Sequence, residues 1–135
     1  MRGEALSERD YRTLAEFRHA LRVFLRFSED AARQVGLTPA QHQLLLAAKG
    51  HAGDGPPAIG DVAESLQLRH HSAVELVDRA EGAGLVERRP DPADARRHLL
   101  VLTADGEAKL AQLSWLHRDE LRRFRQDLVQ HLAAL

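Results

Sequence analysis

Two clusters of basic and hydrogen-bonding side chains lie close together in the sequence. The first cluster is Arg69, His70, His71 and Ser72, with Val74 and Glu75 just after it. The second is a set of four arginines on either side of a turn-rich run: Arg88, Arg89, Arg96 and Arg97. Guanidinium, imidazole and hydroxyl groups donate hydrogen bonds to phosphate oxygens and to the edges of nucleic-acid bases. These residue types therefore suit the recognition of phosphates and bases.

Residues for catalysis or metal binding do not form a recognisable motif. The chain has no cysteine, which excludes disulfides, thiolate metal sites and cysteine-based redox sensing. Among the eight histidines, the adjacent His70 and His71 would point about 100° apart on a helix and make a poor chelate. No His-x-x-x-His pair, nucleophile motif or glycine-rich phosphate loop is present. We therefore expect no enzyme, no metal sensor and no cofactor.

The first cluster lies between two short helical patterns. One apolar face recurs at steps of three and four residues, at Ile59, Val62, Ala63 and Leu66. After a polar break, the same spacing returns at Ala73, Leu76, Val77 and Ala80. Gly84 follows, and a glycine can end a helix in the left-handed conformation. Two short helices about four residues apart predict a helix-turn-helix.

The second cluster lies on a predicted hairpin. Leu85–Arg89 and His98–Thr103 are rich in β-prone residues, and Pro90–Arg97 between them is rich in turn-forming residues. The pattern predicts two strands joined by a loop over residues 90–97. The arginines would flank the tip of that loop.

Longer helical patterns flank this central part. An apolar seam predicts a helix from about Ser7 to Val35. Thr38-Pro39-Ala40-Gln41 predicts the start of a second helix, because Thr38 and Gln41 can form a capping box and proline suits the first turn. This second helix should end at Lys49.

A third flanking pattern follows Thr103, which can cap a new helix. Its seam consists of Leu110, Leu113, Leu116, Leu121, Phe124, Leu128 and Leu132. No glycine or proline interrupts Glu107–Leu135. The segment is either one long helix or two helices with a bend near residues 116–119.

A specific series of short motifs runs from Ile59 to Gly106. In order, these are Val77-Asp78-Arg79, Gly84-Leu85-Val86-Glu87-Arg88, Asp91-Pro92-Ala93-Asp94-Ala95-Arg96, and Val101-Leu102-Thr103 with Gly106. Their order and spacing resemble the winged helix-turn-helix of the MarR family of bacterial transcription regulators. Outside this range, the resemblance rests only on the order and length of the helices.

The resemblance implies a mainly α single domain, residues 1–135, with a small β-hairpin wing. A winged helix-turn-helix DNA-binding lobe would cover residues 37–103. The amino- and carboxy-terminal helices, residues 1–36 and 104–135, would intertwine with those of a second subunit as the dimerisation region. The implied function is a homodimeric repressor on a pseudo-palindromic operator whose half-sites lie about one helical turn apart.

The resemblance also implies a small aromatic or amphipathic effector. It would bind in an apolar cleft between the dimer helices and each lobe, and would change the spacing of the two recognition helices. Phe17, Phe24 and Trp115 could line such a cleft, but each also suits a hydrophobic core. We therefore assign no ligand-binding residue.

By the same resemblance, the second helix of the helix-turn-helix enters the major groove of double-stranded DNA. Arg69 and Ser72 would then contact phosphates, and His70 and His71 would contact guanine or phosphate. Val74 could lie against a thymine methyl group. The alternative interpretation is a solvated helix face with two incidental histidines.

Glu75 could accept a hydrogen bond from a cytosine amino group. Family members more commonly carry Ser or Thr and a basic residue where this chain has Ala73, Val74 and Glu75. The resemblance therefore implies DNA binding without indicating the base sequence that is bound.

The arginines of the wing suit the minor groove and its flanking phosphates, where negative potential concentrates. By resemblance, Asp94 holds the wing and Arg96 is inserted. Asp94 could orient the Arg96 guanidinium or cap the backbone of the turn. Arg97 could pair with Glu87 across the strands. The alternative is that the four arginines only keep the hairpin hydrated.

The composition limits how such a protein could bind DNA. With 135 residues and 44% hydrophobic residues, the chain can form a real core, but its formal net charge is only -1. Any DNA affinity must therefore come from the placement of the charges. The near-neutral charge, with Glu75 and Asp78 on the presumed recognition helix, motivates an alternative: a winged-helix dimer that acts as a protein-interaction adaptor without DNA binding. No signal peptide or membrane span is recognisable, so the cytoplasm is the expected location.

Overall fold

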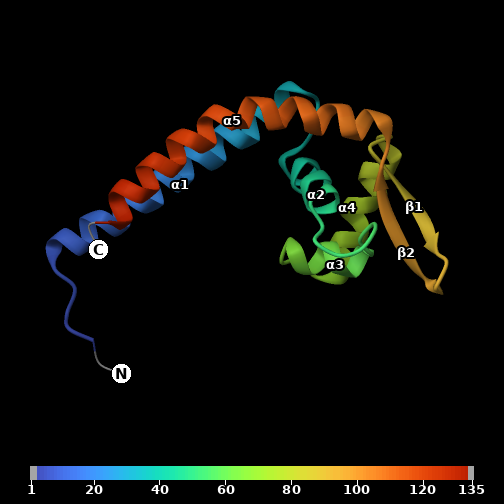
Figure 1. Cartoon of the computed structure of the whole chain (residues 1–135), viewed down its shortest axis with the longest axis horizontal. Coiled ribbons are helices and arrows are strands. Elements are labelled where there is room, and N and C mark those ends of the chain that lie inside the picture. The colour runs from blue at the N-terminus through green and yellow to red at the C-terminus, as the bar shows by residue number, and fades with distance from the viewer. Residues whose placement is uncertain (1–2, 134–135) are drawn as a thin grey trace. The chain divides into compact units, whose positions relative to one another are not determined.

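The computed structural model describes residues 3–133, which form five helices and one two-stranded sheet (Figure 1). In chain order, the elements are α1 (Glu8–Gln34), α2 (Pro39–Lys49), α3 (Ile59–Ser65), α4 (His70–Gly82), β1 (Val86–Asp91), β2 (Asp94–Leu102) and α5 (Ala104–Leu132). This mainly helical architecture with one antiparallel hairpin confirms the predicted fold class. The carboxy-terminal segment is one continuous helix.

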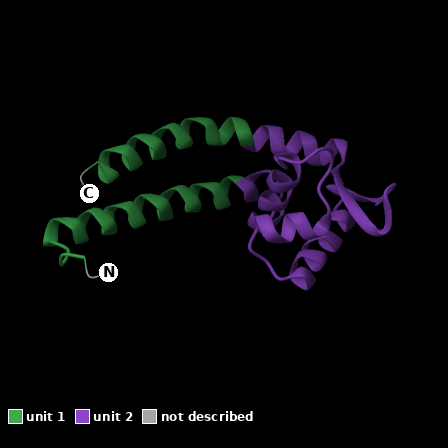
Figure 2. Ribbon diagram, turned by 60° about the horizontal axis from the view of Figure 1, so that its bottom comes forward, with its two compact units in different colours: residues 1–31, 114–135 green, residues 32–113 purple. Residues whose placement is uncertain are grey.

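The chain divides into two compact units (Figure 2). We call residues 32–113 the winged lobe, and residues 1–31 together with 114–135 the helical pair. Helices α1 and α5 each cross the boundary between the units. None of the helices in the described part of the chain is long and apolar enough to span a membrane.

The core of the winged lobe is built from aliphatic side chains on every one of its elements. The large side chains that are less than 2% exposed include Leu44, Leu45, Val62, Val77, Leu85, Val86, Leu100 and Leu113. The predicted capping box begins α2: the Gln41 amide donates to Thr38 Oγ1 over 3.1 Å, and the Thr38 amide donates to Gln41 Oε1 over 3.0 Å. This box satisfies amide groups that have no partner within the helix.

Helices α3 and α4 form the predicted helix-turn-helix. Val62 and Ala63 of α3 and Ala73, Val77 and Ala80 of α4 are buried, as the spacing of three and four indicated. Gly84 has a φ of 76°, so the glycine does end this region in the left-handed conformation. The turn between the helices also places Gln67 at a φ of 56°, which no sequence pattern had indicated.

The hairpin is longer than the sequence predicted. Pro90 pairs with His98, and Asp91 pairs with Asp94, so most of the expected loop over residues 90–97 belongs to the strands. Only Pro92 and Ala93 lie between them. Proline and aspartate are depleted in strands, which is why the composition indicated a loop, but antiparallel pairing extends through both residues.

A remnant of a third strand lies beside β2. Ala58 and Leu99 form an isolated bridge, and the Leu100 amide donates to the Pro57 carbonyl over 2.9 Å. The loop before α3 is thereby joined to the wing. This contact gives β2 a backbone partner on the side away from β1.

In the helical pair, α1 and α5 run antiparallel beside each other (Figure 1). The rings of Phe24 and Phe124 are stacked with centroids 5.0 Å apart. His117 is buried, and its Nε2 atom lies 2.8 Å from Ser28 Oγ. These contacts bury one side of each helix.

A capping box begins α1. The Ser7 amide donates to Asp10 Oδ2 over 3.0 Å, and the Asp10 amide donates to Ser7 Oγ over 3.2 Å. The bond from the Ser7 backbone lowers the pKa of the Asp10 carboxyl group, because it stabilises the charged form. The helix therefore begins close to the predicted residue.

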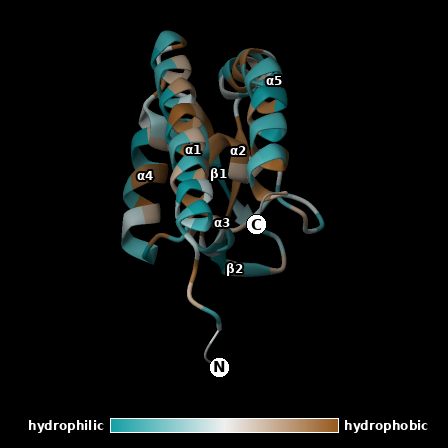
Figure 3. Cartoon of the chain, turned by 90° about the vertical axis from the view of Figure 1, so that its left-hand side faces the viewer, coloured by the Kyte–Doolittle hydropathy of each residue, from teal (hydrophilic) through white to brown (hydrophobic). Residues whose placement is uncertain are grey.

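The expected apolar seams of α1 and α5 are only partly buried within one chain. Hydrophobic residues interrupt the hydrophilic surface of both helices (Figure 3). The exposed seam positions are Leu14, Leu25, Leu116, Leu121 and Leu132. Trp115 is 70% exposed and Val129 is 61% exposed. Two helices cannot enclose side chains that project around most of their circumference.

Candidate nucleic-acid interface

The first predicted cluster lies at the beginning of α4. Arg69 is the extended residue before the helix, and His70 and His71 occupy its first turn with exposed side chains. Glu75 is also exposed, whereas Ser72 and Val74 are half-buried. The opposite side of the helix is anchored in the core through Ala73 and Val77. The core therefore fixes which side chains of α4 face outward.

The fold brings parts of both clusters around one cavity. This cavity has a volume of about 450 Å³ and lies between the beginnings of α3 and α4 and the wing. Five predicted site residues line it: His70, Val74, Arg88, Arg96 and Arg97. The other six, Arg69, His71, Ser72, Glu75, Arg89 and Asp94, are not among its lining residues. We call the exposed surface of Arg69, His70, His71, Arg96 and Arg97 the basic face.

Arg88 is turned toward α4. Its Nη1 donates to Glu81 Oε1 over 2.8 Å, and its Nη2 donates to Asp78 Oδ1. The Arg88 backbone amide also donates to Glu81 Oε2, over 3.0 Å. The hydrogen bond to Asp78, together with the two negative charges, raises the pKa of the guanidinium above its ordinary value. Asp78, which the sequence placed on the outward face of α4, is therefore paired with an arginine.

Arg97 pairs with α3 instead of with the neighbouring strand. Its Nη2 lies 3.2 Å from Asp61 Oδ2, so the pairing with Glu87 that the sequence left open is not the one that forms. Glu87 lies 3.7 Å from Arg89 on the same strand. Asp61 also accepts a hydrogen bond from the Ala58 amide at the start of α3, over 2.9 Å. One carboxylate thus serves both the helix start and the wing.

The tip of the wing is shaped by two aspartates. Asp91 Oδ1 accepts from the Ala93 amide over 2.9 Å, and Asp94 Oδ1 accepts from the Arg96 amide over 3.0 Å. Of the two roles considered for Asp94, the structure shows the backbone bond. Within the described residues, the guanidinium groups of Arg96 and Arg69 make no ion pair. They are the arginines of the basic face whose charge is not already committed to a carboxylate.

The carboxylates that hold the wing are not indicated by the sequence motifs. Asp78 and Glu81 lie three residues apart, a spacing that places both on one face of a helix. That signal was available, but the sequence did not indicate that Arg88 would face the same side. Asp61 gave no signal, because its partner Arg97 lies in a different element.

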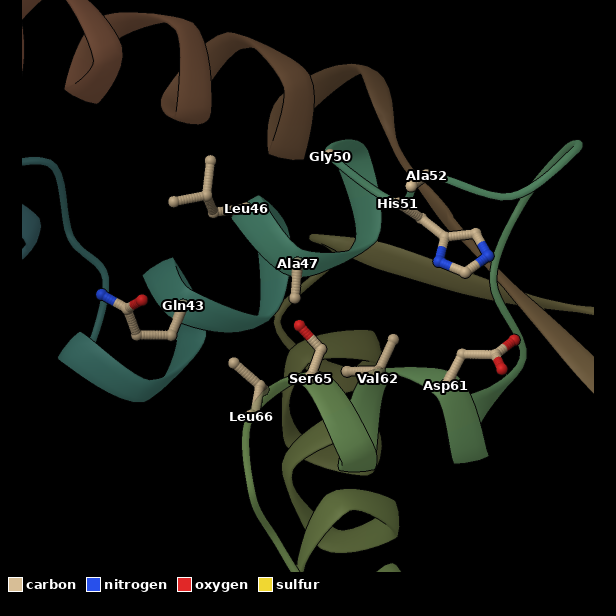
Figure 4. A pocket seen from close by; sticks show the side chains of 10 residues that line it. All are labelled: Gln43, Leu46, Ala47, Gly50, His51, Ala52, Asp61, Val62, Ser65 and Leu66. Atoms are coloured by element: carbon tan, nitrogen blue, oxygen red, sulfur yellow. The ribbon is translucent and has the colours of Figure 1, made fainter.

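A second cavity of about 570 Å³ lies between α2 and α3 (Figure 4). Apolar side chains such as Ala47 and Val62 form much of its wall, and Gln43 and His51 lie at opposite ends of the labelled set (Figure 4). The single carboxylate among its lining residues, Asp61, is already bound to Arg97. No arginine or lysine lines this cavity, so it does not resemble a phosphate-binding surface.

Across residues 3–133, no group of three or more histidine, cysteine or carboxylate side chains is arranged to hold a metal ion. The aromatic residues proposed for a ligand cleft have other surroundings within the helical pair. Phe24 packs on Phe124, and Trp115 is mostly exposed with the Arg118 guanidinium 5.5 Å from its ring centre.

The winged lobe matches a known family model. The model of the MarR family matches residues 35–97, which include α2, α3, α4 and most of the hairpin. The match thus covers the helix-turn-helix and the arginines of the wing.

Two curated relatives each match a little over half of the chain. The transcriptional regulator HosA of Escherichia coli O111:H- is 37% identical over 75 residues, which are 56% of this chain and 53% of that protein. The uncharacterised HTH-type transcriptional regulator YcgE of Bacillus subtilis strain 168 is 39% identical over 79 residues, 58% of this chain and 49% of that protein. The chain thus spans about half the length of the curated relatives it matches.

Among solved structures, a mutant of MarR from E. coli complexed with operator DNA superposes with a TM-score of 0.71. The superposition covers 86% of this chain and 82% of that chain at 23% sequence identity. A likeness at this identity shows a shared fold.

Proposed function

We propose that this chain, which matches the model of the MarR family over residues 35–97, is a sequence-specific DNA-binding transcriptional regulator of that family of winged helix-turn-helix proteins. Both curated relatives carry the name of transcriptional regulators, and the superposed MarR structure holds operator DNA. Neither these relatives nor the family model points to an enzyme, in line with the sequence analysis. The single observation that carries the proposal is the cavity between α4 and the wing, which His70, Arg96 and Arg97 line together.

The placement of charge supports this proposal although the formal net charge is only -1. Asp78 and Glu81 are paired with Arg88, and Asp61 is paired with Arg97. These acidic groups are therefore partly neutralised, while Arg69 and Arg96 keep their full charge available. Local charge of this kind determines affinity for DNA, because phosphate contacts release counterions.

We propose that α4 enters the major groove and that the wing follows the adjacent phosphates or the minor groove. On α4, the contacts would come from Arg69, His70, His71, Ser72, Val74 and Glu75. On the wing, Arg89, Arg96 and Arg97 would contact DNA, while Asp94 holds the turn through the Arg96 amide. The first turn of a recognition helix and the tip of a wing are the parts that reach bases most readily.

We further propose that the protein is a cytoplasmic homodimeric repressor. Residues 1–36 and 104–135 would form the dimer contact, for which the exposed apolar side chains of α1 and α5 provide suitable surface. Two lobes related by a two-fold axis would bind a pseudo-palindromic operator. Release by a small aromatic or amphipathic effector is part of this proposal, and no residue is assigned to its binding.

The test is a titration of the full chain against its own upstream DNA and a scrambled duplex, at about 50 and 200 mM salt. We expect tighter binding to the upstream DNA and a steep loss of affinity at the higher salt concentration. Equal, weak binding to both duplexes at both salt concentrations would contradict the proposal. It would favour the alternative, an adaptor that binds another protein, although one observation behind that alternative is weakened because Asp78 is paired with Arg88.

A further inference from the structure

Arg88 differs from the other arginines of the wing in the number of its bonds to the presumed recognition helix. It contacts two carboxylates of α4 with its guanidinium and one of them also with its backbone amide. Its side chain is 22% exposed, compared with 61% for Arg89 and 50% for Arg97. A guanidinium held in this way would have to leave two carboxylates unpaired in order to reach a phosphate.

The Glu81 carboxylate is fixed by both of its oxygen atoms. Oε2 accepts from the Arg88 amide, and Oε1 accepts from the Arg88 guanidinium. A carboxylate that accepts from both the backbone and the guanidinium of one residue has its orientation fixed relative to that residue. Because Arg88 belongs to β1 and Glu81 to α4, this pair restrains the position of the strand relative to the helix.

The strand register carries this restraint toward the tip of the wing. Arg88 is paired with Leu100 of β2, a side chain that is 1% exposed. Beyond it, Pro90 pairs with His98, and the hairpin then reaches the turn that precedes Arg96. A change in the angle of β1 at Arg88 would therefore move the tip.

We propose that Arg88 is a positioning residue that clamps the wing to the recognition helix through Asp78 and Glu81, and that it makes no contact with DNA. This inference rests on the proposed function and refines it, since sequence analysis had counted Arg88 among the DNA contacts. The clamp fixes the spacing between the two parts of the protein that read DNA. Arg97 and Asp61 make a weaker, more exposed contact on the other strand, so the inference is confined to Arg88.

The first arm of the test needs no DNA. Amide hydrogen exchange and nuclear magnetic resonance relaxation of the full chain would be compared for Asp78→Asn and for Glu87→Gln. Glu87 is the matched control, because it is an exposed carboxylate on the same strand as Arg88 and pairs only with Arg89. We expect faster exchange and greater mobility of the wing in Asp78→Asn and no change in Glu87→Gln. Equal mobility in both variants would overturn the clamp, whether or not the protein binds DNA.

The second arm measures the DNA affinity of Asp78→Asn. The direction of the change in affinity shows whether Asp78 only repels phosphates or belongs to the clamp. If Asp78 only repels phosphates, removing its charge must raise affinity. If it belongs to the clamp, Asp78→Asn lowers affinity, by about tenfold for a coupled pair of this kind. A rise in affinity or no change in Asp78→Asn would contradict the inference.

Arg88 itself gives the last comparison. If Arg88 contacted a phosphate, Arg88→Lys would keep part of that contact. The contact would also contribute about one unit to the slope of log affinity against log salt concentration. A clamp needs the forked guanidinium, so Arg88→Lys should lose affinity nearly as much as Arg88→Ala, with the salt dependence unchanged in both. Rescue by lysine, or a flatter salt dependence in Arg88→Ala, would identify Arg88 as a DNA contact instead. Failure of the wild-type protein to bind any duplex would count against the proposed function and leave the first arm as the test of the clamp.

Discussion

The arginines of the wing are chemically identical but have different freedom to act. Arg88 and Arg97 are paired with carboxylates of α4 and α3, and Arg89 lies 3.7 Å from Glu87. Arg96 is fixed at its backbone by Asp94, and its guanidinium makes no ion pair within the described residues. A guanidinium that is free of carboxylates loses no existing bond when it meets a phosphate. Arg96 is therefore the wing residue best suited to contact DNA.

We expect Arg96→Ala to weaken binding to every duplex by a similar factor, because a phosphate contact carries no base information. The dependence of log affinity on log salt should also become smaller, by about one unit. Binding would be measured over a series of salt concentrations with the upstream and scrambled duplexes. Arg26→Ala is the matched control: it removes the same charge from α1, where the Arg26 side chain is 81% exposed. If both variants change affinity equally, the effect is one of total charge and not of the wing.

For single residues, the sequence indicated which side chains have a role better than it indicated the residues with which they pair. The arginines near the wing tip and the capping role of Thr38 could be predicted, because each depends on neighbours in the sequence. The pairs of Arg88 with Asp78 and of Arg97 with Asp61 could not be predicted, because each joins separate elements. Such a pair exists only after the core has set the distance between those elements.

The junction of the wing with α5 depends on one close approach. Thr103 donates its amide to the Leu85 carbonyl over 3.0 Å and its hydroxyl to the Gly84 carbonyl over 2.6 Å. Its hydroxyl also accepts from the Gly106 amide over 3.1 Å, which begins α5. The first turn of α5 is thus held directly against the segment that leads into β1. This contact requires a glycine at position 106.

A Cβ atom at position 106 would lie 2.1 Å from the Leu85 carbonyl oxygen. Leu85 is 1% exposed and its carbonyl is bound to Thr103, so neither group can move aside easily. We therefore expect Gly106→Ala to lower the free energy of unfolding by about 1–3 kcal/mol, the usual effect of overpacking. Urea denaturation would measure this loss.

Gly82→Ala provides the control for the same substitution in a helix. A Cβ atom at position 82 would have no heavy atom within 4 Å. Alanine favours helix over glycine by about 0.5–1 kcal/mol, so this variant should be as stable as the wild type or more stable. Equal stability of the two variants would show that the close approach at Gly106 is easily relieved.

The spacing of apolar residues predicted which segments form helices. The ends of the strands depended instead on pairing between the strands. The helical spacing at Ile59 and Ala73 predicted α3 and α4, and the capping residues predicted where α2 begins. The ends of the hairpin were predicted less well, because strand pairing is a non-local property. Pro90 and Asp91 lie in β1 since they have partners on β2, although their types are typical of loops.

For the molecule as a whole, the two units differ in how well one chain can enclose its apolar residues. The winged lobe encloses large side chains such as Leu44, Val77 and Leu100 almost completely. The helical pair encloses Ser28 and His117 but leaves Trp115 and Val129 mostly exposed. The sequence pattern correctly predicted amphipathic helices here. It could not show which positions a single pair of helices would cover, because that depends on how many helices surround each seam.

The exposed side of α5 provides the prediction at this scale. In a monomer, Val129→Glu would change stability by no more than about 0.5 kcal/mol, because the side chain is already 61% exposed. In the proposed dimer, the new carboxylate would be placed in an apolar contact, where an unpaired charge is costly. We therefore expect Val129→Glu to shift the chain from dimer to monomer in sedimentation velocity experiments at micromolar concentration. Asp127→Asn, a charge change at an exposed position two residues from Val129 and thus on the other side of the helix, should leave the dimer intact.

The same variant links assembly to DNA binding. A dimer that holds two lobes on one operator binds the second half-site as an intramolecular event, which can raise affinity by about 10²-fold or more without any new contact. Val129→Glu should therefore lose affinity for a full operator while keeping its affinity for an isolated half-site. Asp127→Asn should keep both affinities. If Val129→Glu remains dimeric and binds the operator normally, the dimer contact lies on another part of α1 or α5, and the exposed residues near Val129 have a different role.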